Sequence, residues 1–176
     1  MAALSARDIR RLFELLNAEL RRRETVGELF LVGGAVMGLA YAARSSTQDV
    51  DALFTPAREV RLAAAQVALQ AGLPSDWLND GVKRFLSDSG EFDPFLDLDH
   101  LHVMVARADY LLAMKCLALR IGPEFHDEDD IRYLLRHLDI GSYTQAITTL
   151  GRFYPLERFP QKTLYALQEI LPEDGA

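Results

Sequence analysis

Residues 29–54, LFLVGGAVMGLAYAARSSTQDVDALF, contain the pattern that decides the fold. The apolar run at 29–32 predicts a short buried strand, and a Gly-Gly pair at 33–34 interrupts it. The small residues at 35–43 predict a helix, and after a polar turn residues 48–54 predict a second strand. A strand, a tight turn, a short helix and a second strand together indicate the start of an α/β core.

Two carboxylates, Asp49 and Asp51, lie two positions apart in the second predicted strand. Residues i and i+2 of a strand face the same side, so these carboxylates project together while Val50 points the other way. Neighbouring carboxylates repel each other unless a cation lies between them, and hard oxygen ligands suit Mg²⁺ or Mn²⁺. The spacing therefore predicts a metal site formed by Asp49 and Asp51.

The Gly33-Gly34 turn supplies a second kind of site. Backbone N–H groups at the start of a helix bind phosphate, and glycine lets the phosphate approach closely. A phosphate-binding turn beside a metal-binding acidic pair meets the needs of phosphoryl or nucleotidyl transfer.

This combination of Gly33-Gly34 with Asp49-Val50-Asp51 resembles the signature of the polymerase-beta-type nucleotidyltransferase superfamily. The longer string around it is similar to a bacterial branch of small nucleotidyltransferase-like domains, and to the abortive-infection and toxin–antitoxin nucleotidyltransferases. The similarity continues through LPSDWLNDGVKRFL (73–86), VMVARADYLLAMKCLALR (103–120) and HDEDDIRYLL (126–135).

The resemblance implies roles for the residues of this first segment. Asp49 and Asp51 would hold the Mg²⁺ or Mn²⁺ ion. The triphosphate of a nucleotide substrate would contact the following residues: Gly33, Gly34, Arg44, Ser45 and Thr47. Ser45 and Thr47 are alternatives, and Arg44 is equally open to a structural pairing with an acid.

Lys115 interrupts a nearly apolar helix predicted over 108–121. The pattern alone favours a lysine that extends along the protein surface, with a phosphate contact as the alternative. The resemblance implies the opposite, because a lysine on the equivalent helix of the related toxins faces the active site. Lys115 is therefore a candidate catalytic residue.

A run of four acids, 127–130, begins the next predicted helix. Acidic residues in a first helical turn favour the helix dipole, so capping is the ordinary explanation. Similar sequences carry a Lys-Asp-x-x-Asp element here, which Asp127 and Asp130 match while His126 replaces the lysine. The resemblance implies that one of these two acids reaches the active site from the helical part, with Asp127 preferred over Asp130.

A third carboxylate often completes the metal site in this superfamily, on a strand beside the Asp-x-Asp strand. Asp97 and Asp99 are the nearest candidates, but both lie outside the clear predicted strand at 101–106. Asp127 is the other candidate, and the sequence leaves the choice open.

Composition sets the broad class. The 176 residues are 49% hydrophobic and 26% charged, which is typical of globular proteins. The net charge of −7 argues against broad nucleic-acid binding but leaves room for one RNA end as substrate. The single cysteine, Cys116, lies in an apolar predicted helix, so we expect it to be a core residue. The sequence contains no apolar run of the kind that predicts a membrane span or a signal peptide. We expect a cytoplasmic protein.

The predicted fold is α/β (α+β), a small mixed sheet with flanking helices and a C-terminal helical part. Residues 1–107 form the predicted nucleotidyltransferase-like core, and residues 108–176 form the helical part. An amphipathic helix over 5–23, with Ser5 and Asp8 in a capping box, begins the core.

The resulting functional prediction is a metal-dependent transfer of a nucleoside monophosphate from a nucleoside triphosphate. The acceptor hydroxyl is an RNA end such as that of tRNA, a protein side chain, or a small molecule. The partners would include a cognate antitoxin or regulator. One alternative is a degenerate nucleotidyltransferase that binds nucleotide without catalysis, and another is a structural or regulatory member of a toxin–antitoxin pair.

Overall fold

The computed structural model describes residues 3–122 and 124–172, and it confirms the mixed α/β class. The chain forms two compact units. The first contains the described residues up to Arg84 together with Phe92–Ala106, and the second contains Phe85–Glu91 and the described residues from Arg107 onward. The two predicted parts divide the chain near the same point, but they place residues 85–91 with the first part.

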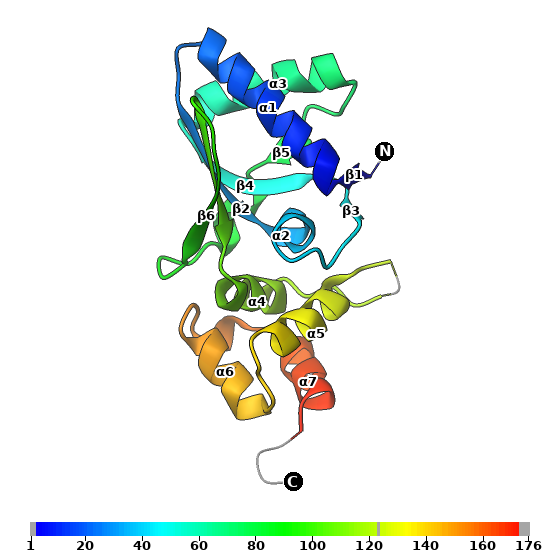
Figure 1. The fold of residues 1–176 in the computed structure, drawn as a ribbon. Helices are drawn as coiled ribbons and strands as arrows, with labels where there is room; N and C mark the ends of the chain where they lie inside the picture. The colour runs from blue at the N-terminus through cyan, green and yellow to red at the C-terminus, as the bar shows by residue number, and fades with distance from the viewer. Residues whose placement is uncertain (1–2, 123, 173–176) are drawn as a thin grey trace. The chain divides into compact units, whose positions relative to one another are not determined.

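A five-stranded mixed sheet forms the centre of the first unit (Figure 1). In spatial order its strands are β5 (Leu78–Asn79), β4 (Val50–Thr55), β2 (Gly27–Val32), β7 (Leu101–Ala106) and β6 (Phe92–Asp97). Strand β2 runs antiparallel to β4 and parallel to β7, while β5 runs parallel to β4 and β6 runs antiparallel to β7.

Helices α1 (Ala6–Arg22) and α3 (Ala57–Ala71) lie side by side against one face of this sheet (Figure 1). Alternate strand residues point into this layer and are buried: Leu29, Leu31, Val50, Ala52, Phe54, Leu101, Val103 and Val105. The predicted capping box is present, since the Asp8 N–H donates to Ser5 Oγ and the Ser5 N–H donates to Asp8 Oδ2.

The opposite face of the sheet is half-buried and carries Asp51, one member of the predicted acidic pair. Asp51 is paired with Val32 across strands β4 and β2, and Leu53 is paired with Phe30. These positions alternate with buried Val50, so the predicted orientation of the strand is confirmed.

Two element boundaries differ from prediction in the segment that decides the fold. Strand β4 begins at Val50, so Asp49 lies immediately before it. Helix α2 (Gly33–Leu39) begins at the Gly pair and ends four residues earlier than expected. Ala42 has a φ of 51°, so a right-handed helix cannot extend through it to the predicted end at residue 43.

Residues 44–47 are tied to the start of α1 by a small antiparallel pairing that the sequence did not predict. Strand β3 (Ser46–Thr47) pairs with β1 (Leu4–Ser5), with Thr47 opposite Leu4. This pairing fixes the polar turn that follows α2.

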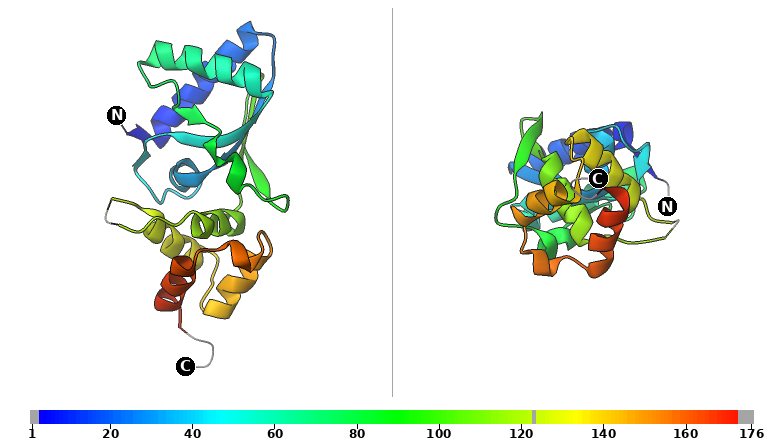
Figure 2. Two further views of the ribbon diagram at one scale, coloured as in Figure 1. Left: turned by 180° about the vertical axis from the view of Figure 1, so that it is seen from behind. Right: turned by 90° about the horizontal axis from the view of Figure 1, so that it is seen from below.

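Helices form most of the second unit (Figure 2). Its helices are α4 (Ala108–Leu117), α5 (Asp127–His137), α6 (Tyr143–Gly151), α7 (Gln161–Ile170) and the 3-10 turn η2 (Leu156–Arg158). A further 3-10 turn, η1 (Gly81–Phe85), belongs to the first unit up to Arg84, and the second unit begins at its last residue, Phe85. Cys116 is fully buried in α4, as predicted, and burial raises the pKa of its thiol. Among the described residues, no helix combines the length and the apolar character needed to cross a bilayer.

Side-chain hydrogen bonds explain why residues 85–91 belong to the second unit. The Tyr110 hydroxyl accepts from the Ser87 N–H at 2.9 Å, and the Tyr154 hydroxyl donates to the Phe85 carbonyl. A side chain at Gly90 would meet the ring of Tyr110 at 2.4 Å, so only glycine allows this packing.

Candidate functional site

The predicted Gly-Gly turn lies directly against one of the predicted metal-binding carboxylates. Gly33 follows β2 with a φ of +71°, and a Cβ atom placed there would lie 2.9 Å from Asp51 Oδ2. Glycine is required here both for its backbone conformation and for the close approach of the carboxylate. The pairing of Val32 with Asp51 brings the two segments together.

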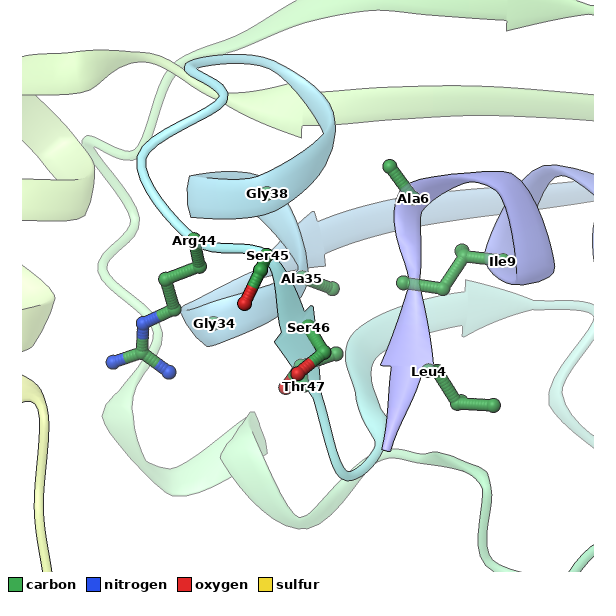
Figure 3. Close-up of a pocket in the computed structure, with 10 residues that line it drawn as sticks. All are labelled: Leu4, Ala6, Ile9, Gly34, Ala35, Gly38, Arg44, Ser45, Ser46 and Thr47. Carbon is green, nitrogen blue, oxygen red and sulfur yellow. The ribbon is translucent and has the colours of Figure 1, made fainter. Parts of the chain in front are cut away.

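Gly34 faces the two predicted phosphate contacts that follow α2. A Cβ atom at Gly34 would lie 2.7 Å from Arg44 Nη1 and 3.0 Å from Thr47 Oγ1. Figure 3 shows the Arg44 side chain and Thr47 beside Gly34. The absence of a side chain at Gly34 therefore lets a cationic group and a hydroxyl pack against its backbone.

Thr47 and Ser45 were alternatives for the same role, and the structure places them differently. The Thr47 hydroxyl lies near Gly34 and donates to the Asp49 carbonyl at 3.3 Å, while Ser45 is exposed. Thr47 is thus the hydroxyl that connects the glycine turn with the acidic pair.

A shallow hollow lies beside this turn (Figure 3). Its space, open solvent included, is about 160 Å³, and its lining consists of Leu4, Ala6, Ile9, Gly34, Ala35, Gly38, Arg44, Ser45, Ser46 and Thr47. Pockets that enclose whole small-molecule ligands measure about 300–1,000 Å³. The hollow by itself does not enclose a nucleotide.

Asp49 has a hydrogen-bond partner that sequence reasoning did not identify. Asn79 pairs with Asp51 across strands β5 and β4, and its side-chain Nδ2 donates to Asp49 Oδ2 at 3.2 Å. Its Oδ1 accepts from the Gly81 N–H at 3.2 Å. The available signal was the WLND string at 77–80, which belongs to the resembling segments but carried no assigned role.

Asp97 and Asp99, candidates for a third carboxylate, lie away from the acidic pair. Strand β6 is separated from β4 by two strands, and Asp97 is level with His102 and Glu28 at the opposite end of the sheet from Asp51. Asp97 contacts His102, and Asp99 forms an ion pair with Arg21 at 2.8 Å. Across residues 3–122 and 124–172, no three His, Cys, Asp or Glu side chains are grouped closely enough to hold a metal ion.

Lys115 and Asp127 lie together in the second unit, in a buried charge cluster. Lys115 Nζ is 3.1 Å from Asp127 Oδ1 and 2.8 Å from Asp130 Oδ2. All three side chains are less than a tenth exposed. The cluster gives Lys115 the two carboxylate partners that a buried ammonium group needs.

Arg120 completes this cluster through Asp127. Asp127 Oδ2 accepts from the Arg120 main-chain N–H at 3.2 Å and from its Nε at 2.9 Å. Burial raises the pKa of Asp127, but the hydrogen bonds and charges of Arg120 and Lys115 outweigh it and hold the pKa below its usual value. Helix α4 ends at Leu117, earlier than the predicted residue 121, and beyond this end the Arg120 N–H donates to Asp127 instead of to a helix carbonyl.

The first unit thus combines a glycine turn, a guanidinium group, a threonine hydroxyl and two carboxylates at one end of β2 and β4. Comparisons of the chain with models of known protein families, with curated proteins and with solved structures find no match. The nucleotidyltransferase assignment therefore stays a prediction from the motifs.

Proposed function

We propose that the protein is a metal-dependent nucleotidyltransferase that moves a nucleoside monophosphate from a nucleoside triphosphate to an acceptor hydroxyl. The observation that carries the proposal is the contact between Gly33 and Asp51, with Arg44 and Thr47 packed against the adjacent Gly34. Groups suited to a triphosphate and groups suited to a divalent cation meet there in one unit of the fold.

The donor set fits Mg²⁺ or Mn²⁺. Asp51 is half-buried on the side of β4 opposite buried Val50, Asp49 is half-buried immediately before the strand, and both offer hard oxygen ligands. Mg²⁺ is commonly held by one or two carboxylates, with substrate phosphates and water completing its octahedron. A pair of carboxylates beside a phosphate-binding turn satisfies this requirement without a third acid.

Each residue then has a defined part in the transfer. Asp49 and Asp51 would bind the cation, and the glycine turn would let the phosphates approach the backbone. Arg44 would contact a phosphate through its planar guanidinium, and Thr47 would donate a hydroxyl hydrogen bond. When bound, the cation would neutralise charge on the departing pyrophosphate and lower the pKa of the attacking hydroxyl.

The transfer itself is a displacement at the α-phosphorus. The acceptor oxygen forms a bond to that phosphorus, the bond to the β-phosphate oxygen breaks, and pyrophosphate and a proton are released. The resemblance extends the proposal to an acceptor such as a tRNA end, a protein or a small molecule. It also supports a place in a toxin–antitoxin pair with a cognate regulator, in the cytoplasm.

Lys115 and Asp127 enter this proposal through the resemblance. Lys115 would stabilise charge on the leaving phosphates, and Asp127 would contribute a carboxylate. Their mutual ion pair, which also engages Asp130, equally suits a structural role in the helical unit.

A second candidate function is a degenerate nucleotidyltransferase that binds nucleotide without transferring it. One observation favours it: Lys115 is engaged by two buried carboxylates, as a structural lysine would be. Such a protein would keep the glycine turn and the metal-binding pair but lack turnover.

Pyrophosphate release tests both candidates. The full-length protein would be incubated with Mg²⁺, each of the four ribonucleoside triphosphates in turn, and total RNA or lysate as acceptor. The wild type is compared with Asp49→Asn/Asp51→Asn and with Asp93→Asn, a matched loss of an exposed carboxylate on β6.

Release by the wild type and Asp93→Asn, and its loss in the double variant, is the expected result. Equal release by all three proteins would refute the proposed site. Metal-dependent nucleotide binding without release in any mixture would favour the degenerate protein.

A further inference from the structure

We infer that Asn79 is a positioning residue that holds the Asp49 carboxylate in the orientation required for metal binding. The inference rests on the metal site of the proposed function and assigns it a residue outside the Gly-Gly and Asp-x-Asp motifs. Asn79 acts through Asp49 by donating from Nδ2 to Oδ2 at 3.2 Å.

The orientation of the Asn79 amide follows from its second partner. The Gly81 N–H requires an acceptor, and it meets Asn79 Oδ1 at 3.2 Å. The opposite amide orientation would set NH₂ against this N–H and an oxygen against the Asp49 carboxylate. Both contacts of that alternative are repulsive, so the NH₂ group faces Asp49.

The backbone that carries Asn79 is held firmly by its neighbours. Trp77 is 2% exposed, and its indole Nε1 donates to the Ala64 carbonyl at 3.0 Å. The Trp77 carbonyl accepts from the Val50 N–H at 2.7 Å, immediately after Asp49 in the chain. Asn79 lies in β5 and Asp49 immediately precedes β4, so the fixed register of these two strands holds the residues beside each other.

The chemistry of the pair explains why an amide suits this position. Hydrogen bonds from neighbouring groups orient the carboxylates that bind metals and tune their affinity. An aspartate at position 79 would place a third negative charge against Asp49, whereas the neutral NH₂ group orients the carboxylate without adding repulsion. Loss of such a partner typically weakens metal affinity about 10- to 100-fold.

Direct Mn²⁺ binding by the full-length chain provides the test. Free Mn²⁺ would be followed by electron paramagnetic resonance during titration of wild type, Asn79→Ala and Asp80→Ala. Asp80 is the matched control because it lies in the same turn and pairs with Arg61 at 2.8 Å and Lys83 at 2.5 Å. We expect its removal to disturb the turn and to leave the Asn79–Asp49 hydrogen bond in place, because that bond does not involve Asp80.

We expect Mn²⁺ affinity to fall about 10- to 100-fold in Asn79→Ala. Affinity in Asp80→Ala should stay within about threefold of wild type, because salt screens the loss of one partly exposed charge. Equal affinity of wild type and Asn79→Ala would overturn the positioning role alone. Equal losses in both variants would assign the effect to the turn and would also overturn it.

A metal-free measurement separates this inference from the proposed function. The side-chain NH₂ resonances of Asn79, identified by their absence in Asn79→Ala, should shift in Asp49→Asn. Resonances that stay unchanged would disprove the hydrogen bond itself. If the Asn79 resonances shift in Asp49→Asn but the wild type binds no Mn²⁺, the metal site is refuted. Both the proposed function and the positioning role would then be refuted with it.

Discussion

Replacing Lys115 with methionine tests whether this residue stabilises the helical unit. Methionine approximates the volume of lysine, so the change removes the charge with little change in packing. Lys115 contacts Asp127 at 3.1 Å and Asp130 at 2.8 Å, and all three side chains are less than a tenth exposed. The variant would leave two buried carboxylates without their shared ammonium partner.

The expected loss of unfolding free energy is about 3–5 kcal/mol, the usual effect of removing one partner from a buried ion pair. Arg120 continues to donate to Asp127 through its Nε at 2.9 Å, so the main effect falls on Asp130. A second variant, Lys115→Met/Asp130→Asn, removes that buried charge and should recover a large part of the loss.

Urea denaturation provides the assay, with two signals that report on different parts of the chain. Far-UV circular dichroism follows the helices, and the single tryptophan, Trp77, reports on the first unit, where it is 2% exposed. We expect the dichroism midpoint of Lys115→Met to fall and that of the double variant to rise again.

A loss below about 1 kcal/mol in Lys115→Met would refute the structural account of this cluster. If that variant also lost pyrophosphate release, the phosphate contact implied by the family resemblance would be the better explanation. If the double variant recovered none of the lost stability, the loss in Lys115→Met would come from packing and not from charge.

Two further predictions concern the glycine turn and acid stability. In Gly34→Ala the new Cβ atom would lie 2.7 Å from Arg44 Nη1, at the end of a long side chain, and 3.0 Å from the Thr47 hydroxyl, so the thermal midpoint should stay nearly unchanged. The same variant should weaken triphosphate binding measured by calorimetry. Unaltered binding would contradict the phosphate site. The pKa of Asp127 is held below its ordinary 3.8, so the stabilisation from its ionised form should be complete above that pH and should disappear as the pH falls through the lowered pKa. The difference in unfolding free energy between wild type and Asp127→Asn, measured by denaturation from neutral to acid pH, should therefore shrink as the pH falls. A difference that stays constant over this range would contradict the assignment.

Local patterns in the sequence predicted much of the first unit. Strand alternation gave the buried side of β4, helical spacing gave the buried face of α1, and the Ser5–Asp8 capping box marked its start. These features depend on residues close in the chain, so short-range periodicity and hydrogen bonding determine them.

Other features depend on residues that are distant in the chain. Asn79 meets Asp49 only because β5 pairs with β4 across 30 positions of sequence. Asp97 is a sequence candidate for the third carboxylate of the metal site, but strand order and register place it at the opposite end of the sheet from Asp51. Sequence spacing carries no information about which strands become neighbours.

The sequence by itself determined the mixed α/β class, the Gly-Gly turn, and the side of β4 on which Val50 is buried opposite Asp51. Only the tertiary structure decided that Gly33 lies against Asp51 and that Lys115 is shared by Asp127 and Asp130. The physical reason is range: backbone periodicity and capping are local, whereas a charged side chain acquires its partners when separate helices and strands pack together.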